Sequence, residues 1–78
     1  MNGRAGKQSD TSIEIVVNGE RRAVPAEMRV SELVTEMGLQ PERVALELNR
    51  EILARPNWRT TVLAAGDRLE IVHFVGGG

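Results

Sequence analysis

Residues 13–24 read IEIVVNGERRAV, and this stretch decides the first step of the fold. β-Branched residues dominate positions 13–17, and Asn18-Gly19 separates them from the second segment. Both turn residues tolerate the positive φ that a type I′ turn requires, so the stretch predicts a β-hairpin. The sequence leaves its register open. A two-residue loop would place on one face Ile13, Ile15, Val17 and Val24, together with Glu20 and Arg22.

An amphipathic helix is predicted after the hairpin, because apolar residues recur at the i, i+3, i+4, i+7 spacing of one helix face. The stripe consists of Val30, Leu33, Val34 and Met37. Ser31 is a favourable residue for the N-cap. A start at Arg29 is the alternative, since it pairs Met28 with Leu33 as a hydrophobic staple. Gly38 is expected to end the helix in a left-handed conformation.

The second half of the chain contains further short strands. Pro41 is expected to prevent a new helix from starting nearby, and Pro56 interrupts an irregular stretch. In the last strand, Leu69 and Ile71 are expected to point inward. In chain order the segments are a strand over 44–48, a turn over 49–51, a short apolar piece at 52–53, an irregular stretch over 55–61, a turn at 66–67 and a strand over 68–75.

The predicted order is therefore β-β-α-β-(short β)-β. One main helix packed on one mixed sheet is an α+β design of two layers. A hairpin, a helix across it and strands returning beside it describe the ubiquitin-like β-grasp fold. We divide the chain into a flexible leader over residues 1–12, a β-grasp domain over 13–75 and a flexible glycine tail over 76–78.

Composition excludes several classes of function. The chain of 78 residues suffices for one domain, and it contains no Cys, which excludes disulfides, thiolate metal sites and a side-chain persulfide. Ten Lys and Arg against eleven Asp and Glu give a net charge of −1, so no basic field for nucleic acid is expected. No apolar run reaches the roughly 18–20 residues of a membrane span, and no secretory signal is visible. We expect a cytoplasmic protein with neither a nucleic-acid nor a membrane partner.

Side chains suited to catalysis are scarce, since the chain has one His and neither Cys nor Tyr. His73 is interpreted as a surface or interface residue, with a proton-transfer role as the alternative. Trp58 is expected to plug the irregular stretch against the core, with a partner contact as the alternative. Gly3 to Lys7 has neither the spacing nor the context of a phosphate-binding loop. The sequence predicts no catalytic residue, no metal site and no bound cofactor, and hence a protein that is not itself an enzyme.

Packing explains the three closing glycines, Gly76, Gly77 and Gly78, less well than any other feature. Ordering Gly in a strand costs conformational entropy, so we expect an exposed tail. Without Cβ atoms, Gly76 and Gly77 can thread a narrow slot in a partner's active site and deliver the α-carboxylate of Gly78. That carboxylate becomes an acyl electrophile once AMP is attached, and a sulfur nucleophile can then leave a thiocarboxylate. ATP, Mg²⁺ and the groups that bind phosphate would have to come from another protein. A glycine tail without a function is the alternative.

Residues 66–78, GDRLEIVHFVGGG, closely resemble the ending of the ThiS-type sulfur carriers of thiamine biosynthesis. The resemblance covers residues 13–78, essentially the whole domain. Ala54 departs from it where Pro is usual, and Pro56 departs where Ser is common. Further positions similar to the family are residues 44–53, Arg55, Trp58, Asn18-Gly19 and the helix start at 30–34.

The resemblance implies a function that depends on other enzymes. A ubiquitin-activating-like adenylyltransferase would adenylate Gly78 with ATP and Mg²⁺. A cysteine desulfurase, directly or through a relay, would supply the sulfur, and thiazole synthase would accept it. The alternatives are a sulfur carrier of another pathway, such as the small subunit of molybdopterin synthase, a ubiquitin-like modifier of lysines, and an interaction-only β-grasp domain.

Val72, Phe74 and Val75 are the residues predicted to dock these partners. If alternate residues of the last strand point inward, Val72 and Phe74 project outward beside the tail. Exposed together they would form an apolar patch, which tends to mark a partner surface. Cover by a short strand or loop is the alternative.

Overall fold

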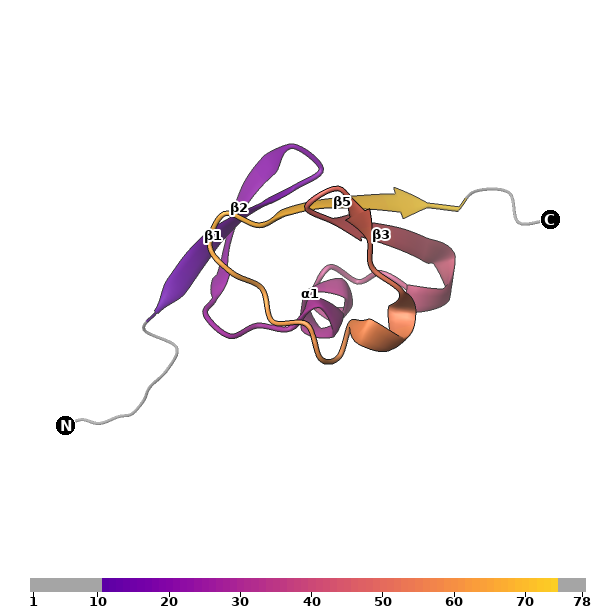
Figure 1. Ribbon diagram of the computed structural model, residues 1–78, viewed down its shortest axis with the longest axis horizontal. Coiled ribbons are helices and arrows are strands. Elements are labelled where there is room, and N and C mark those ends of the chain that lie inside the picture. The colour runs from indigo at the N-terminus through magenta and orange to yellow at the C-terminus, as the bar shows by residue number, and fades with distance from the viewer. Residues whose placement is uncertain (1–10, 75–78) are drawn as a thin grey trace.

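The computed structural model describes residues 11–74 (Figure 1). Residues 1–10 of the predicted leader therefore lie outside the described residues. Val75 and the glycine tail over 76–78 also lie outside them. The first strand begins at Ser12. In chain order the elements are β1 (Ser12–Val17), β2 (Glu20–Pro25), α1 (Val30–Glu36), the 3₁₀ helix η2 (Pro41–Arg43), β3 (Val44–Leu48), β4 (Glu51–Ile52), the 3₁₀ helix η3 (Arg55–Asn57) and β5 (Arg68–His73).

The first hairpin has the two-residue loop, which settles its register. Asn18 and Gly19 have φ values of 51° and 84°, so both adopt the left-handed conformation that the sequence predicts. Val17 pairs with Glu20 directly beside the loop. The predicted shared face is confirmed, and its two polar members lie on an edge strand, where long side chains reach water.

The five strands form one mixed sheet in the order β2-β1-β5-β3-β4. Strand β5 lies in the centre, parallel to β1 and antiparallel to β3. A parallel connection needs a long crossover, and the chain between β1 and β5 supplies it with α1 on one face of the sheet (Figure 1). This arrangement is the ubiquitin-like β-grasp fold, and it confirms the predicted fold class.

Helix α1 has its N-cap at Arg29, which decides between the two predicted starts. The Arg29 backbone N–H donates to Glu32 Oε1 at 2.8 Å, as in a capping box. Arg29 also forms a β-bridge with Val62, a contact that sequence periodicity cannot indicate. Gly38, with φ of 76°, ends the helix as predicted, and its N–H donates to the Thr35 carbonyl.

The hydrophobic core fills the space between α1 and the inner face of the sheet. Trp58 belongs to it and is 3% exposed, while its Nε1–H donates to the Leu53 carbonyl at 2.8 Å. The predicted role of Trp58 as a plug is therefore confirmed. The buried residues are Ile15, Val17, Val24, Val30, Leu33, Val34, Val44, Leu46, Trp58, Leu63 and Leu69.

Three local predictions need correction. A 3₁₀ helix begins at Pro41, because the fixed φ of proline suits a first helical position that needs no N–H donor. Another 3₁₀ helix, η3, lies within the stretch predicted to be irregular, with Pro56 in its first turn. Strand β5 ends at His73 rather than Val75, because its partner β3 begins at the residue opposite, Val44.

Within residues 11–74, no helix is long and apolar enough to cross a membrane.

Candidate functional site

The candidate site is built around the end of the central strand β5, from which the chain continues toward its C-terminus. Strand β5 is paired with β1 at its first two residues and with β3 from Leu69 to His73, so its neighbours in the sheet set its direction. Beyond the strand, the Phe74 backbone N–H still donates to the Arg43 carbonyl at 2.9 Å. The predicted tail residues Gly76, Gly77 and Gly78 lie outside the described residues, and the chemistry assigned to them stays a prediction.

Two of the three residues predicted to dock partners lie on the outer face of the sheet, away from α1. Val72 is 58% exposed and Phe74 is 51% exposed. By contrast, Leu69 on the inner face is 1% exposed and Ile71 is half-buried. The predicted alternation along β5 is therefore confirmed, while the third residue, Val75, lies outside the described residues.

Two members of this apolar surface were not predicted from the sequence. Ala45 lies directly opposite Val72 in the β3–β5 pair and is exposed. Ile52 in β4 is 80% exposed and pairs with Glu47, which places it on the same outer face. Ala45, Ile52 and Phe74 also line one hollow of about 300 Å³. We call Ala45, Ile52, Val72 and Phe74 the tail-side patch.

The sequence shows that Ile52 is apolar, but it does not show by itself which face of the sheet Ile52 occupies. The face of a two-residue strand depends on its register with its neighbour, and a shift by one residue reverses it. The register is set by the turn at Asn49-Arg50, where both residues have positive φ (53° and 74°). Arg50 is an unusual residue for that conformation, so the sequence did not indicate a two-residue loop there.

Acidic residues lie next to the tail-side patch. Glu47 and Glu70 are exposed and directly opposite each other in the β3–β5 pair. Like charges in this position are unfavourable for the isolated sheet. A cationic group from outside the chain would relieve that repulsion.

Comparison with known proteins identifies the family of this chain. A family model described as the ThiS family matches residues 12–78. The chain belongs to the ThiS family. The match includes every strand of the sheet, both 3₁₀ helices and the three closing glycines.

Relatives and solved structures agree with this assignment. The sulfur carrier protein ThiS of Bacillus subtilis is 37% identical over 49 residues, which are 63% of this chain and 74% of that protein. The crystal structure of the thiamine biosynthesis protein ThiS from Geobacter metallireducens has a TM-score of 0.73 and 35% identity, and the match covers 85% of this chain and 100% of the other.

A third relative is much longer than this ThiS-family chain. The thiazole synthase of Paramagnetospirillum magneticum is 41% identical over 66 residues, which are 85% of this chain but 20% of that protein. The chain thus spans about a fifth of the thiazole synthases that it matches.

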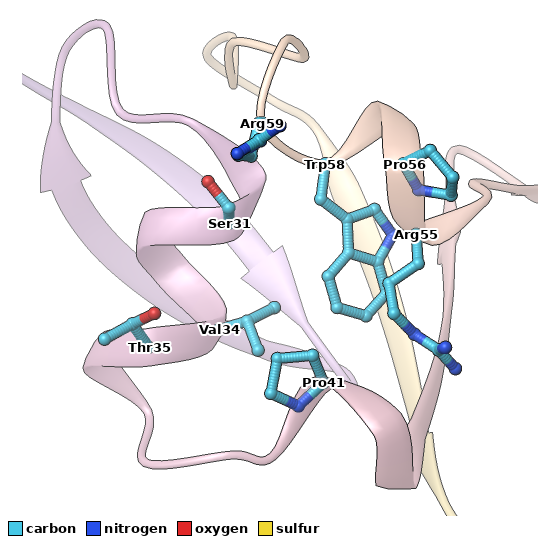
Figure 2. A pocket seen from close by; sticks show the side chains of 8 residues that line it. All are labelled: Ser31, Val34, Thr35, Pro41, Arg55, Pro56, Trp58 and Arg59. Carbon is cyan, nitrogen blue, oxygen red and sulfur yellow. The ribbon is translucent and has the colours of Figure 1, made fainter.

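A larger cleft lies on the helix side of this ThiS-family domain and contains none of the tail-side patch. Its volume is about 560 Å³, and Figure 2 shows it between α1 and the segment that contains η3. Two guanidinium groups and two hydroxyl groups surround an apolar floor, and the lining includes no carboxylate, His or Cys. The cleft therefore lacks a general base. The lining residues are Ser31, Val34, Thr35, Pro41, Arg55, Pro56, Trp58 and Arg59.

The remaining titratable groups do not assemble into a reactive centre within the part of the chain that the structure describes. No group of three or more His, Cys, Asp or Glu side chains is placed to hold a metal ion among residues 11–74. His73 is exposed at the end of β5, in agreement with its interpretation as a surface residue.

Proposed function

We propose that this ThiS-family chain is a sulfur carrier protein of thiamine biosynthesis and that it carries sulfur as a thiocarboxylate on Gly78. One observation carries the proposal: the family match spans residues 12–78, from the first strand to the last of the three glycines. The names of the relatives from B. subtilis and G. metallireducens point to the same function.

The proposed chemistry takes place at the carbonyl carbon of Gly78. An oxygen of the carboxylate attacks the α-phosphorus of ATP, which forms an acyl adenylate and releases pyrophosphate. Sulfide then attacks the acyl carbon, the bond to AMP breaks, and a thiocarboxylate remains. When that sulfur is transferred to an acceptor, the bond between the acyl carbon and sulfur breaks, and an oxygen atom from the acceptor or from water takes its place and regenerates the carboxylate. Gly76 and Gly77 provide the narrow tether that such active sites require.

In this proposal the chain is a co-substrate, and its partners supply the catalytic groups. A ubiquitin-activating-like adenylyltransferase provides the site for ATP and Mg²⁺, and a cysteine desulfurase or a sulfur relay provides the sulfur. Thiazole synthase accepts it during formation of the thiazole ring. A region similar to this chain makes up a fifth of the P. magneticum thiazole synthase, which supports a shared pathway. The cytoplasm is the expected compartment.

The tail-side patch is the proposed docking surface for these partners, extended by Val75. The patch lies beside the point where the tail leaves, so a partner that covers it also receives the tail. Exposed apolar residues such as Val72 and Phe74 gain from burial in a complex. Glu47 and Glu70 at its border favour a partner that places Lys or Arg next to its own apolar surface.

The proposal is tested by intact-mass measurement of the carrier. The full chain is incubated with a ThiS-activating adenylyltransferase, ATP, Mg²⁺ and sulfide. The expected product is heavier by the difference between a sulfur and an oxygen atom, and a fragment that contains Gly78 carries the gain. Formation of conjugates that resist reductant and join Gly78 to lysines would contradict the proposal and favour a protein modifier.

A matched pair of extended chains tests the role of the terminus. One alanine added after Gly78 removes the terminal carboxylate from its reacting position, so adenylation is expected to be abolished. One alanine added before Met1 has the same composition and should leave adenylation unchanged. Equal adenylation of both chains would show that Gly78 is not the reacting residue.

A further inference from the structure

The two sides of β5 are held differently near the tail. On one side, β3 continues to the end of β5, where Val44 pairs with His73. On the other side, β1 ends at Val17, opposite Leu69. The last part of β5 therefore extends beyond β1, and the backbone groups that face this side need other partners.

The side chain of Asn18 supplies those partners. Its Oδ1 accepts a hydrogen bond from the Ile71 backbone N–H at 2.7 Å, and its Nδ2 donates to the Ile71 carbonyl at 3.3 Å. The Asn18 backbone N–H also donates to the Leu69 carbonyl at 2.9 Å. The amide group thus replaces the next residue of β1 and extends the parallel pairing by one step after the chain has turned away.

We propose that Asn18 is a positioning residue for the C-terminal tail, because it holds the last part of β5 in the direction that delivers Gly78 to a partner's active site. The inference rests on the proposed function. It adds a role to a residue that the sequence assigned only to a turn. Four residues separate Phe74 from the end of the chain and fully extended span at most roughly 14 Å. A change of direction at the end of β5 therefore displaces the terminal carboxylate by a distance that matters for reaction.

A second asparagine separates this role from a purely structural one. Asn49 also has positive φ, 53°, and also starts a two-residue turn. Its Oδ1 accepts from the Arg68 N–H at 2.9 Å, and its Nδ2 donates to Asp67 Oδ1 at 3.0 Å. Asn49 therefore holds the first residue of β5, whereas Asn18 holds its fourth, close to the tail.

The experiment compares Asn18→Gly with Asn49→Gly. Glycine adopts positive φ without strain, so both turns are expected to persist. Each substitution removes two side-chain hydrogen bonds, so similar losses of stability are expected, and thermal unfolding checks that both variants fold. Amide hydrogen exchange of Ile71 is expected to accelerate about tenfold more in Asn18→Gly than in Asn49→Gly.

The functional measurement is steady-state adenylation at a temperature where both variants are folded. For Asn18→Gly we expect kcat/KM to fall about tenfold, mainly because KM for the carrier rises. For Asn49→Gly we expect kcat/KM and KM to stay within about twofold of the values for the unsubstituted chain. Asn18→Asp keeps the acceptor for the Ile71 N–H and tolerates the turn, so an intermediate KM is expected. Equal losses in the two glycine variants would overturn the inference.

The outcomes also distinguish this inference from the proposed function. If the unsubstituted chain is not adenylated at all, the proposed function fails, and exchange of the Ile71 amide still reports whether Asn18 holds the strand. If the unsubstituted chain is adenylated and Asn18→Gly matches it in KM, only the positioning role fails.

Discussion

Strand β5 carries apolar residues on both faces, and the two faces have opposite environments. Leu69 on the inner face is 1% exposed, whereas Val72 on the outer face is 58% exposed. Helix α1 covers the inner face, and among residues 11–74 no element covers Val72 and Phe74 to the same extent. Similar side chains therefore contribute to folding on one face and remain available to a partner on the other.

The largest expected effect comes from truncation on the inner face. Leu69→Ala removes part of a fully buried side chain from the centre of the sheet, so we expect the free energy of unfolding to fall by about 2–5 kcal/mol. A loss of this size approaches the total stability expected of so small a domain. Urea unfolding followed by circular dichroism measures it. Val72→Ala is the matched control on the outer face and should change stability by less than about 0.5 kcal/mol. Equal losses would refute the contrast between the faces.

A smaller loss is expected where the core meets η3. Trp58→Phe removes the Nε1–H that donates to the Leu53 carbonyl and leaves that acceptor without its partner. We expect the free energy of unfolding to fall by about 1–3 kcal/mol. Because Trp58 is only 3% exposed, KM for adenylation should not change when the variant is compared in its folded state. A raised KM with unchanged stability would indicate instead that Trp58 contacts a partner.

The parts of the fold that the sequence predicts are those with local signals. The hairpin, the helix and the order of elements follow from local signals, namely Asn18-Gly19 and the apolar stripe of α1. Local signals left the helix start open between Ser31 and Arg29, and the observed N-cap at Arg29 is accompanied by a bridge to Val62, which lies far along the chain. The exposure of Ile52 depends on the register of β4, which two neighbouring residues with positive φ determine.

The candidate site was also predictable only where a local pattern exists. Alternation along β5 placed Val72 and Phe74 outward, because period two is a property of any strand. The bonds from Asn18 to Ile71 join residues 53 positions apart, and no sequence pattern announces such a contact. A residue that serves both a turn and a distant strand is identified as a turn residue alone, because only the turn has a local signature.

On the outer face, the expected effect is on binding instead of stability. Phe74→Asp introduces a charge into the tail-side patch, so we expect KM for the carrier in adenylation to rise about tenfold, equivalent to about 1.4 kcal/mol. The free energy of unfolding should change by less than about 0.5 kcal/mol, because half of the Phe74 side chain is already in water. Unchanged turnover at limiting carrier would remove this surface from the proposal.

Val62→Asp is the matched control for that substitution. Val62 is 49% exposed, close to the value of 51% for Phe74, but it lies outside the tail-side patch. The same charge at that position should leave KM unchanged. A similar rise in KM for both variants would show that the added negative charge, and not the patch, affects the encounter with the partner.

The smallest expected effect is at the border of the patch. Ile52 is 80% exposed in an edge strand, so Ile52→Ser should not lower the free energy of unfolding measurably. Residues around the centre of an interface exclude water and contribute little by themselves. We therefore expect KM for the carrier to rise by only about two- to threefold. A rise in KM as large as that expected for Phe74→Asp would place the centre of the docking surface on β4 instead of β5. The partner would then contact the edge of the sheet more closely than the strand that carries the tail.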